Sequence, residues 1–583
     1  MTKRIAVIEP PFIEPGMPYP EIVNVADLLN CAGAMAIPVD INIRLFRSIL
    51  AEPFGGSISW EKLISAVADA FFIDHDKLKN HIINKYGSLD DISEALSNAL
   101  RDKDILKIEA LKQDAMNRFD GSGKYINHYQ YIRDIELFNV LLGYKIKQID
   151  ADANLSMDNY DNNINIQSSK AILKYLKKRD NGLILLYEKY LANELSSWNY
   201  DDIIIIITNQ TQLVPGLVLA SWMKNKLKLK VTLNGSYIDD VFKLHIPGEL
   251  FEHLDAIIAY RIDYSANYWL KQLQHNYIIS HPIHSYPDFR QSNNQKVIYF
   301  SRTFPVSNLE LYFTPLPIIG ASVSSRCYWS KCKFCAVSCQ DKYPFKYQKS
   351  ETTLEIVKKH QKDYGVNHVQ FLDYALPPAF LKRFCHSKNL NVFWSCQTRF
   401  EKSFLEEGFF QRLFSSGCTS ISWGFETGSE KILKLMNKGG EINKLSRQKI
   451  LKASFEAGII NHLFVITGLP YETDDDFLET VYFLYENINV ISGIEVYPFQ
   501  LHPHTAIGRN PFRYGFKTQE KSDDWCMDIP FTGEPDKKTA IKRAKYLKDT
   551  FGFVSKQSKT NDYLEGHLTF SRRFKETVSY GRI

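Results

Sequence analysis

Four cysteines on one short stretch are the residues whose type and spacing point most directly to chemistry. Cys327, Cys332 and Cys335 form a C-x4-C-x2-C array, and Cys339 follows four residues later. Thiolates are soft ligands that suit zinc or an iron–sulfur cluster. Three of them could hold three corners of a cubane and leave the fourth iron open, whereas all four could close a structural zinc site. Four unrelated core thiols are the third interpretation, and core packing gives little reason for it.

Two motifs further along the chain give the array a context. Trp423–Glu430 reads Trp-Gly-Phe-Glu-Thr-Gly-Ser-Glu, and Phe464–Glu472 reads Phe-Val-Ile-Thr-Gly-Leu-Pro-Tyr-Glu. Together with the array, and with Phe334 just before its third cysteine, these motifs resemble the radical S-adenosylmethionine (SAM) superfamily over residues 318–510. The usual first gap in that family is one residue shorter, and some cobalamin-associated members share the longer gap. The resemblance implies SAM and a 4Fe–4S cluster bound by Cys327, Cys332 and Cys335.

Length and composition limit the number of domains and the classes of partner that we expect. A chain of 583 residues with 44% hydrophobic and 23% charged residues predicts about three globular domains. The net charge of +5 gives no reason to expect a nucleic-acid partner, which calls for a clustered basic surface. No apolar run approaches the ~18 residues of a membrane span. The first residues lack the pattern of a signal peptide, so we expect a cytoplasmic protein whose reducing surroundings suit a cluster.

Apolar runs alternating with helical periodicity predict a parallel α/β sheet in the first half. The run Ile203–Thr208, five isoleucines and a threonine, is typical of a strand buried on both faces. We assign residues 1–52 and 200–292 to this Rossmann-like domain. Its expected strands are Ile5–Ile8, Ile37–Ile41, Ile203–Thr208, Val231–Ser236, Leu254–Ala259 and Tyr277–Ser280.

The layout of this half resembles the cobalamin-binding domain that precedes the barrel in one radical SAM subgroup. The D-x-H-x-x-G motif, whose histidine would ligate cobalt, is absent, as it is from many members. Thr208, Asn234, Gly235 and Ser236 lie at strand C-terminal ends, where a doubly wound sheet binds ligands, and are the candidate cobalamin contacts. The alternative is ordinary turn chemistry in a vestigial scaffold domain.

A helical insertion, residues 54–199, separates the two sheet segments. Apolar residues at helical spacing recur along it, for example Leu89, Ile92, Leu96 and Leu100. The Asn- and Asp-rich stretch Met157–Ser169 predicts a flexible link.

Strands and helices then alternate through residues 318–510, which predicts a partial (β/α)6 barrel. Residues 511–583 are a small C-terminal extension. Chemistry in such barrels gathers at the C-terminal strand ends, where Asp373, Arg399, Glu426 and Glu472 fall.

The resemblance also suggests SAM-binding roles. Glu426 is the expected partner of the ribose and ammonium groups, and Gly424 allows close backbone approach. Arg399 is a bidentate partner for the methionine carboxylate. Adenine is expected against Ile466, Gly468 and the backbone around Phe334.

Several of these residues have plainer interpretations. Glu472 is as consistent with helix capping as with cofactor contact. Asp373 either positions substrate or closes a turn. Cys396 and Cys418 are expected in the core, and the pair His502 and His504 is more often structural.

The sequence therefore predicts a radical SAM enzyme that acts on a peptide or small molecule and takes electrons from a donor such as flavodoxin or ferredoxin. Its most specific form is cobalamin-dependent methylation of an unactivated carbon. The alternatives are a cobalamin-independent epimerase, cyclase or rearrangement enzyme and, in another class, a zinc-stabilised binding module.

Overall fold

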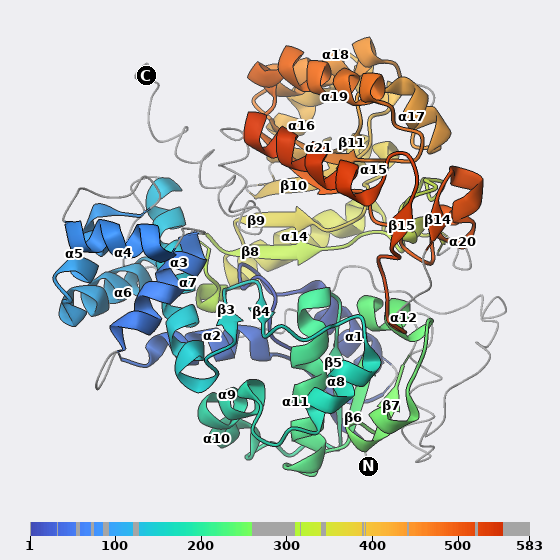
Figure 1. Cartoon of the computed structure of the whole chain (residues 1–583). Coiled ribbons are helices and arrows are strands. Elements are labelled where there is room, and N and C mark those ends of the chain that lie inside the picture. The colour runs from blue at the N-terminus through green and yellow to red at the C-terminus, as the bar shows by residue number, and fades with distance from the viewer. Residues whose placement is uncertain are drawn as a thin grey trace. The chain divides into compact units, whose positions relative to one another are not determined.

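The computed structural model describes residues 2–31, 33–53, 59–71, 75–84, 92–120, 128–258, 309–314, 316–339, 345–386, 390, 392–439, 442–518 and 523–551. The chain divides into two compact units (Figure 1). Unit 1 is Met1–Pro287 with Thr303–Pro315, and unit 2 is Leu316–Ile583 with Asp288–Arg302.

Unit 1 is built on a five-stranded sheet whose pairs are all parallel. The order β2-β1-β5-β6-β7 makes it doubly wound, with the chain reversing direction between β1 and β5. The isoleucines of β5 are buried, and α1 (Pro20–Cys31) packs its apolar residues on one face of the sheet. The expected strand Tyr277–Ser280 lies outside the described residues. The strands are β1 (Arg4–Glu9), β2 (Met35–Asp40), β5 (Asp202–Ile206), β6 (Val231–Asn234) and β7 (Ala256–Ile257).

The segment between the two halves of this sheet is helical, as predicted. Its helices are α2 (Ile41–Ala51), α3 (Trp60–Phe71), α4 (His75–Asn84), α5 (Glu94–Arg101), α6 (Ile105–Phe119), α7 (His128–Ile149), α8 (Ser169–Leu176), α9 (Gly182–Tyr190) and α10 (Ala192–Leu195). After the segment come α11 (Leu213–Asn225) and α12 (Ser236–Phe242).

The prediction of a flexible link at Met157–Ser169 was wrong. A short hairpin of β3 (Asn154–Leu155) and β4 (Tyr160–Asp161) begins there. Leu155 and Met157 are buried, and the backbone N–H of Met157 donates to Asn139 Oδ1 at 2.9 Å. A few buried apolar side chains therefore hold this polar stretch against the helices.

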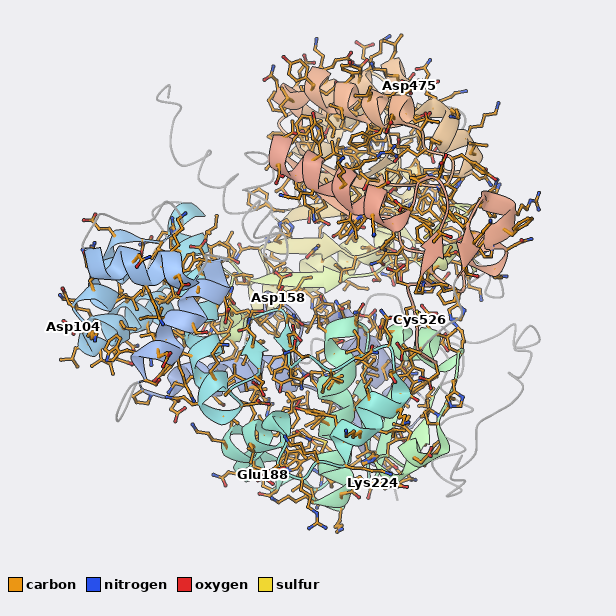
Figure 2. All side chains as sticks on the ribbon, viewed as in Figure 1. Asp104, Asp158, Glu188, Lys224, Asp475 and Cys526 are labelled. Atoms are coloured by element: carbon orange, nitrogen blue, oxygen red, sulfur yellow. The ribbon has the colours of Figure 1, made fainter. Side chains whose placement is uncertain are left out.

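Unit 2 contains six parallel strands in sequential order, which confirms the partial (β/α)6 barrel and the α/β fold class. The strands are β8 (Ile318–Ala321), β9 (His368–Phe371), β10 (Phe393–Thr398), β11 (Cys418–Glu426), β12 (Ile460–Thr467) and β13 (Gly493–Pro498). The main helices are α14 (Ser350–Tyr364), α15 (Pro378–Phe384), α16 (Phe409–Ser415), α17 (Glu430–Leu435), α18 (Lys444–Glu456), α19 (Asp474–Glu486) and α21 (Lys537–Thr550). Asp475, labelled in Figure 2, belongs to the acidic first turn of α19.

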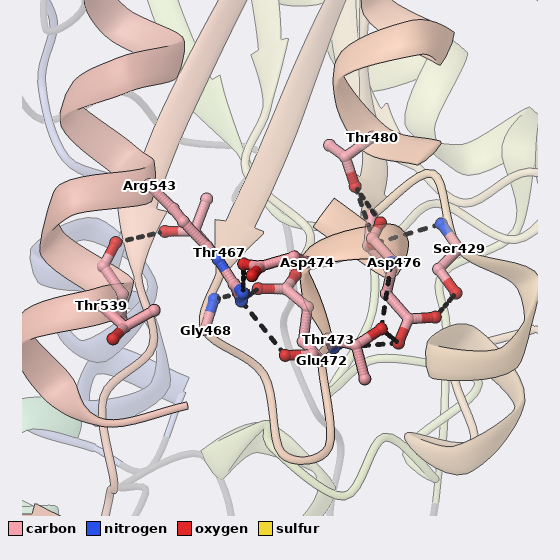
Figure 3. Close-up of polar contacts among 12 residues, drawn as sticks. Ser429, Thr467, Gly468, Glu472, Thr473, Asp474, Asp476, Thr480, Thr539 and Arg543 are labelled. Atoms are coloured by element: carbon pink, nitrogen blue, oxygen red, sulfur yellow. Dashed lines mark hydrogen bonds and ion pairs between the residues drawn. The ribbon is translucent and has the colours of Figure 1, made fainter. Parts of the chain in front are cut away.

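Helix α21 covers the last two strands of the barrel although it lies beyond residue 510, our predicted barrel boundary. Thr467 Oγ1 donates to the backbone oxygen of Ala540 at 2.8 Å. A Cβ on Gly468 would stand 2.3 Å from Ala540 Cβ, so only glycine lets the helix approach this closely. Arg543 of α21 forms an ion pair with Glu472 at 2.7 Å and bonds Asp474 (Figure 3). The extension thus supplies a wall of the barrel.

Among the described helices, none is long and apolar enough to cross a membrane.

Candidate active site

The base of the cysteine loop is fixed where it leaves and rejoins the barrel. Ser324 and Tyr347 form an antiparallel bridge. Asp373, just after β9, accepts hydrogen bonds from the backbone N–H groups of Val323 (3.0 Å) and Ser324 (2.7 Å). The Ser324 hydroxyl also donates to it. Burial raises the pKa of Asp373 to about 6, although these donors oppose the shift. Asp373 therefore anchors the loop, a role that neither of our two interpretations included.

The middle of the loop docks on the turn after α17. Trp329 Nε1 donates to the backbone oxygen of Asn437 at 2.8 Å. The backbone N–H of Lys333 donates to the backbone oxygen of Met436 at 3.0 Å. Tyr328 donates to Glu401 at 2.7 Å, just past β10. These contacts hold the cysteines against the C-terminal ends of β10 and β11.

Among the described residues, Cys327, Cys332 and Cys335 form no disulfide bond. Cys332 is buried, whereas Cys327 and Cys335 are half-buried. Burial raises the pKa of the Cys332 thiol to about 12, while the positive charges of Lys438 and Arg399 favour the thiolate. The side chain of Cys339 lies outside the described residues, so its assignment stays a prediction.

In the described part of the chain, no group of three or more His, Cys, Asp or Glu side chains surrounds a point that one metal ion could occupy. A cubane makes a different demand, because each cysteine ligates its own iron and the sulfurs stand farther apart than around one zinc. Three thiols on one loop beside two cations suit that anionic cluster chemically.

Glu426 forms a buried ion pair with Lys438 at 2.7 Å. It ends β11 at an irregularity in the pairing with β12, and its φ is +64°. The Lys438 side chain lies against Gly424, where a Cβ would stand 2.6 Å from Lys438 Nζ. The close approach that we expected at Gly424 is therefore made by a side chain of the same chain.

Sequence reasoning missed Lys438. The lysine reaches Glu426 only because the chain reverses after α17, with Asn437 at a φ of +54°. An asparagine and a lysine directly after a short helix were the available signal, since asparagine often takes this conformation at helix ends.

Arg399 is buried and lies over the ring of Trp329, with 3.8 Å from the guanidinium carbon to the ring centre. Its Nη1 stands 3.5 Å from Glu401 Oε1, and Nη2 donates to the backbone oxygen of Lys438. Among the described residues, Nε and Nη1 form no hydrogen bond. Two donors of a planar guanidinium thus stay available for a carboxylate.

Phe334 and Ile466 pack on one apolar cluster, centred on Leu469, Phe499 and Phe516. Gly468 behaves differently, because the space beside it belongs to Ala540 and its N–H donates to Glu472 Oε2 at 2.7 Å. The structure therefore brings Phe334 and Ile466 together and turns Gly468 toward α21.

Glu472 is only 3% exposed and is bonded to Gly468 and Arg543 (Figure 3). Burial raises its pKa to about 7 against the opposing effect of these partners. These contacts give Glu472 a structural role at the α21 junction. Cys396 and Cys418 are buried, as expected of core residues.

The four residues predicted to contact cobalamin lie at the ends of β5 and β6, but their contacts are internal. Thr208 donates through its N–H and Oγ1 to Gln212 Oε1 at 3.0 and 3.1 Å. Asn234 Nδ2 donates to the oxygen of Ile258 at 2.9 Å. A Cβ on Gly235 would stand 2.1 Å from the backbone oxygen of Ile207. Ser236 is exposed.

Gln212 bridges the point where the strand order reverses. Its side chain is fully buried, and its Nε2 donates to Glu9 and, at 3.0 Å, to the oxygen of Pro10. Next to it, Tyr312 donates to Asp40 at 2.7 Å, and burial raises the pKa of Glu9 and that of Asp40, the latter to about 6. At this edge Gln212 bonds to Glu9 and Thr208, while Ser236 is exposed and Glu9 Oε2 is buried without a hydrogen-bond partner among the described residues.

Comparison with known proteins decides the class of unit 2. Residues 322–484 match the model of the Radical SAM superfamily. The chain carries a radical SAM domain. Enzymes of this superfamily use a 4Fe–4S cluster and SAM. The match begins just before the cysteine loop and ends within α19.

Solved structures give only distant likenesses. The methyltransferase TsrM from Kitasatospora setae, solved with cobalamin and a [4Fe-4S] cluster, has 10% identity and a TM-score of 0.42, over 59% of this chain and 70% of that one. The cobalamin-dependent enzyme OxsB has 14% identity and a TM-score of 0.45, over 68% of each chain. At these scores the likenesses carry no argument. No curated protein matches the chain.

Proposed function

We propose that this enzyme uses Cys327, Cys332 and Cys335 to bind a 4Fe–4S cluster and cleaves SAM to form a 5′-deoxyadenosyl radical, which takes a hydrogen atom from a peptide or small-molecule substrate. The observation that carries the proposal is the convergence of the cysteine loop with Arg399, Glu426 and Lys438. When bound and reduced, the cluster supplies the electron that breaks the sulfonium bond.

The residues around the loop would bind and orient SAM. Arg399 offers its two unbonded donors to the methionine carboxylate. Glu426 already faces an ammonium group, that of Lys438, which supports a role with the ribose and ammonium groups of SAM. Phe334 and Ile466 offer a shared apolar surface to the adenine.

Of the two enzyme forms, the cobalamin-independent one is better supported. A five-stranded sheet of order 2-1-3-4-5 is compatible with a ligand at its switch point. Gln212 instead bonds there to both Glu9 and Thr208. We therefore favour a scaffold role for unit 1, with cobalamin-dependent methylation as the alternative.

Anaerobic reconstitution with iron and sulfide, followed by dithionite and SAM, tests the proposal. We expect roughly four irons per chain and release of 5′-deoxyadenosine. Stoichiometric zinc without SAM cleavage would instead establish the zinc module. Hydroxocobalamin added before gel filtration tests the scaffold role, which cobalamin retained at one equivalent would contradict. Flavodoxin or ferredoxin can replace dithionite to test the electron donor.

A further inference from the structure

The inner face of the barrel can be read from strand register. On β12, Asn461 bonds to the oxygen of Leu451 in α18, and Thr467 bonds to α21, so the odd-numbered residues face the helices. Residues alternate along a strand, and the even-numbered ones face inward. Registered pairs then define one inward row across four strands, Gln397, Ser422, His462 and Gly493.

This row contains three polar side chains and a glycine, where barrels of this kind are usually filled by branched apolar side chains. The row nearer the strand N-termini is likewise polar or glycine at Gly320, Gln370, Ser395 and Ser420, and it ends at the apolar Ile460 of β12. The row nearer the C-termini contains Gly424, Phe464 and Glu495, and all three are partly exposed. Solvent therefore reaches the inner face from the end that carries the cysteine loop.

His462 stands out in this row. It is 1% exposed, and neither ring nitrogen has a hydrogen-bond partner among the described residues. Burial lowers its pKa to about 4, so the ring is neutral. Gly493 gives the ring its place, because a Cβ there would stand 2.4 Å from His462 Cδ2. Gln370 Oε1, in the adjacent row, is likewise buried without a partner in the described chain.

A buried polar group without a partner costs stability, so such groups persist where a ligand completes them. His368 is the structural counterexample in the same barrel, because its Nε2 lies 2.9 Å from Ser395 Oγ. His462 lies one inward row, about 7 Å along the strand, below the level of Gly424 and Phe464. A group held there would lie beneath the cofactor end of the barrel.

We propose that His462, with Ser422 and Gln397, binds an uncharged hydrogen-bonding group of the substrate, an amide or a hydroxyl. A neutral imidazole offers one donor and one acceptor, which matches either group. The row contains no cation that would favour a carboxylate or phosphate. This inference rests on the proposed function, since it treats the barrel interior as the substrate site.

Thermal unfolding of the full chain tests whether the unpaired ring of His462 lowers the stability of the protein. We expect His462→Leu to raise the unfolding midpoint by about 2 °C, because an unpaired polar group is replaced by an apolar one. His368→Leu, the matched control, should lower it. A fall for His462→Leu like that for His368→Leu would overturn the proposal. His462→Gln, which keeps hydrogen-bonding capacity, should stay near wild type and covers the case in which leucine does not fit.

Binding is tested directly on protein with labelled histidine rings, with His462→Gln identifying the His462 signal. Millimolar acetamide or ethylene glycol should shift that signal saturably, and acetate should not. A response to acetamide alone points to an amide-bearing substrate, and a response to the glycol alone points to a hydroxylated one. No response, or an equal response to acetate, contradicts the proposal. The SAM cleavage assay of the wild type fails or succeeds independently of these results.

Discussion

The two parallel sheets of this chain differ in the side-chain contacts at their C-terminal strand ends. In unit 1, Gln212 links Glu9, Thr208 and Pro10 into one buried network, and Tyr312 closes on Asp40. In unit 2, the strand ends bring Arg399, Glu426 and Lys438 to a cysteine loop, and Arg399 keeps donors unbonded within the described residues. The side chains of the first edge bond largely to one another, although Glu9 Oε2 is buried without a hydrogen-bond partner among the described residues, while the second edge holds charges that suit a charged ligand.

The difference teaches that a shared topology sets where a ligand could bind and not whether one does. The switch point of a doubly wound sheet is a favourable place for a cofactor. In unit 1 a single glutamine, with donors and an acceptor on one amide, bonds to groups on both sides of that point. Function in this chain is therefore assigned from side-chain contacts rather than from sheet order.

The sharpest test of unit 2 is Cys332→Ser. We expect SAM cleavage to fall more than 100-fold and the iron content to drop, because the cluster loses one of three thiolate ligands. Anaerobic iron analysis and 5′-deoxyadenosine chromatography measure both.

Two variants serve as controls for the cysteine assignment. Cys31→Ala, at an exposed cysteine of unit 1, should leave both quantities unchanged. Cys339→Ala should keep most of the activity, and an inactive but folded Cys339 variant would show that a fourth thiolate is needed.

Gln212→Leu probes the closed edge of unit 1. It leaves the fully buried Glu9 without its hydrogen-bond donor and removes the acceptor of the Thr208 and Asn209 N–H groups, so we expect the free energy of unfolding of unit 1 to fall by about 3 kcal/mol. Denaturant titration measures this. Gln210→Leu is a matched control at an exposed glutamine two residues away. If Gln212→Leu is as stable as wild type, the network does not hold this edge together.

Lys438→Met should weaken SAM binding by roughly 50-fold, because it leaves the buried carboxylate of Glu426 without its partner and removes a cation beside Cys332. Anaerobic calorimetry on reconstituted protein measures the dissociation constant. Lys434→Met, at an exposed lysine of α17 four residues before Lys438, is the control. Unchanged affinity in Lys438→Met would remove the lysine from the SAM site.

The smallest effect is the pH dependence set by Glu472. Burial raises its pKa from 4.5 to about 7 in the folded chain. Such a carboxyl stabilises the fold below about pH 4.5 and loses this contribution as the pH rises through 7. Between pH 5 and 7, the free energy of unfolding of the wild type should fall by up to about 2 kcal/mol relative to that of Glu472→Gln. Parallel pH profiles of the two proteins would contradict the shift.

Much of the fold followed from local pattern. The isoleucine run Ile203–Thr208 predicted a strand buried on both faces, and every residue of β5 is buried. The hairpin near Met157 did not follow, because its stability comes from contacts with α7 that no local pattern contains.

The site was predictable to the extent that motif residues carry it. The cysteines, Arg399 and Glu426 were found from spacing and resemblance, and the structure brings Arg399 and Glu426 to Cys332. Lys438 was missed because its position depends on a chain reversal, and Gly468 faces α21 because that helix arrives from about seventy residues away. Contacts between segments distant in sequence are what a single sequence leaves open.

The late arrival of α21 also bears on how the protein is made. β12 and β13 leave the ribosome before the helix that covers them exists, since the Thr467 contact spans 73 residues. Until residue 550 is synthesised, the nascent barrel exposes apolar strands and the carboxyl of Glu472 has no arginine. Nascent chains that stop just after β13 should therefore be the ones that chaperones bind and proteases clear, and release of a folded barrel should wait for the final helix.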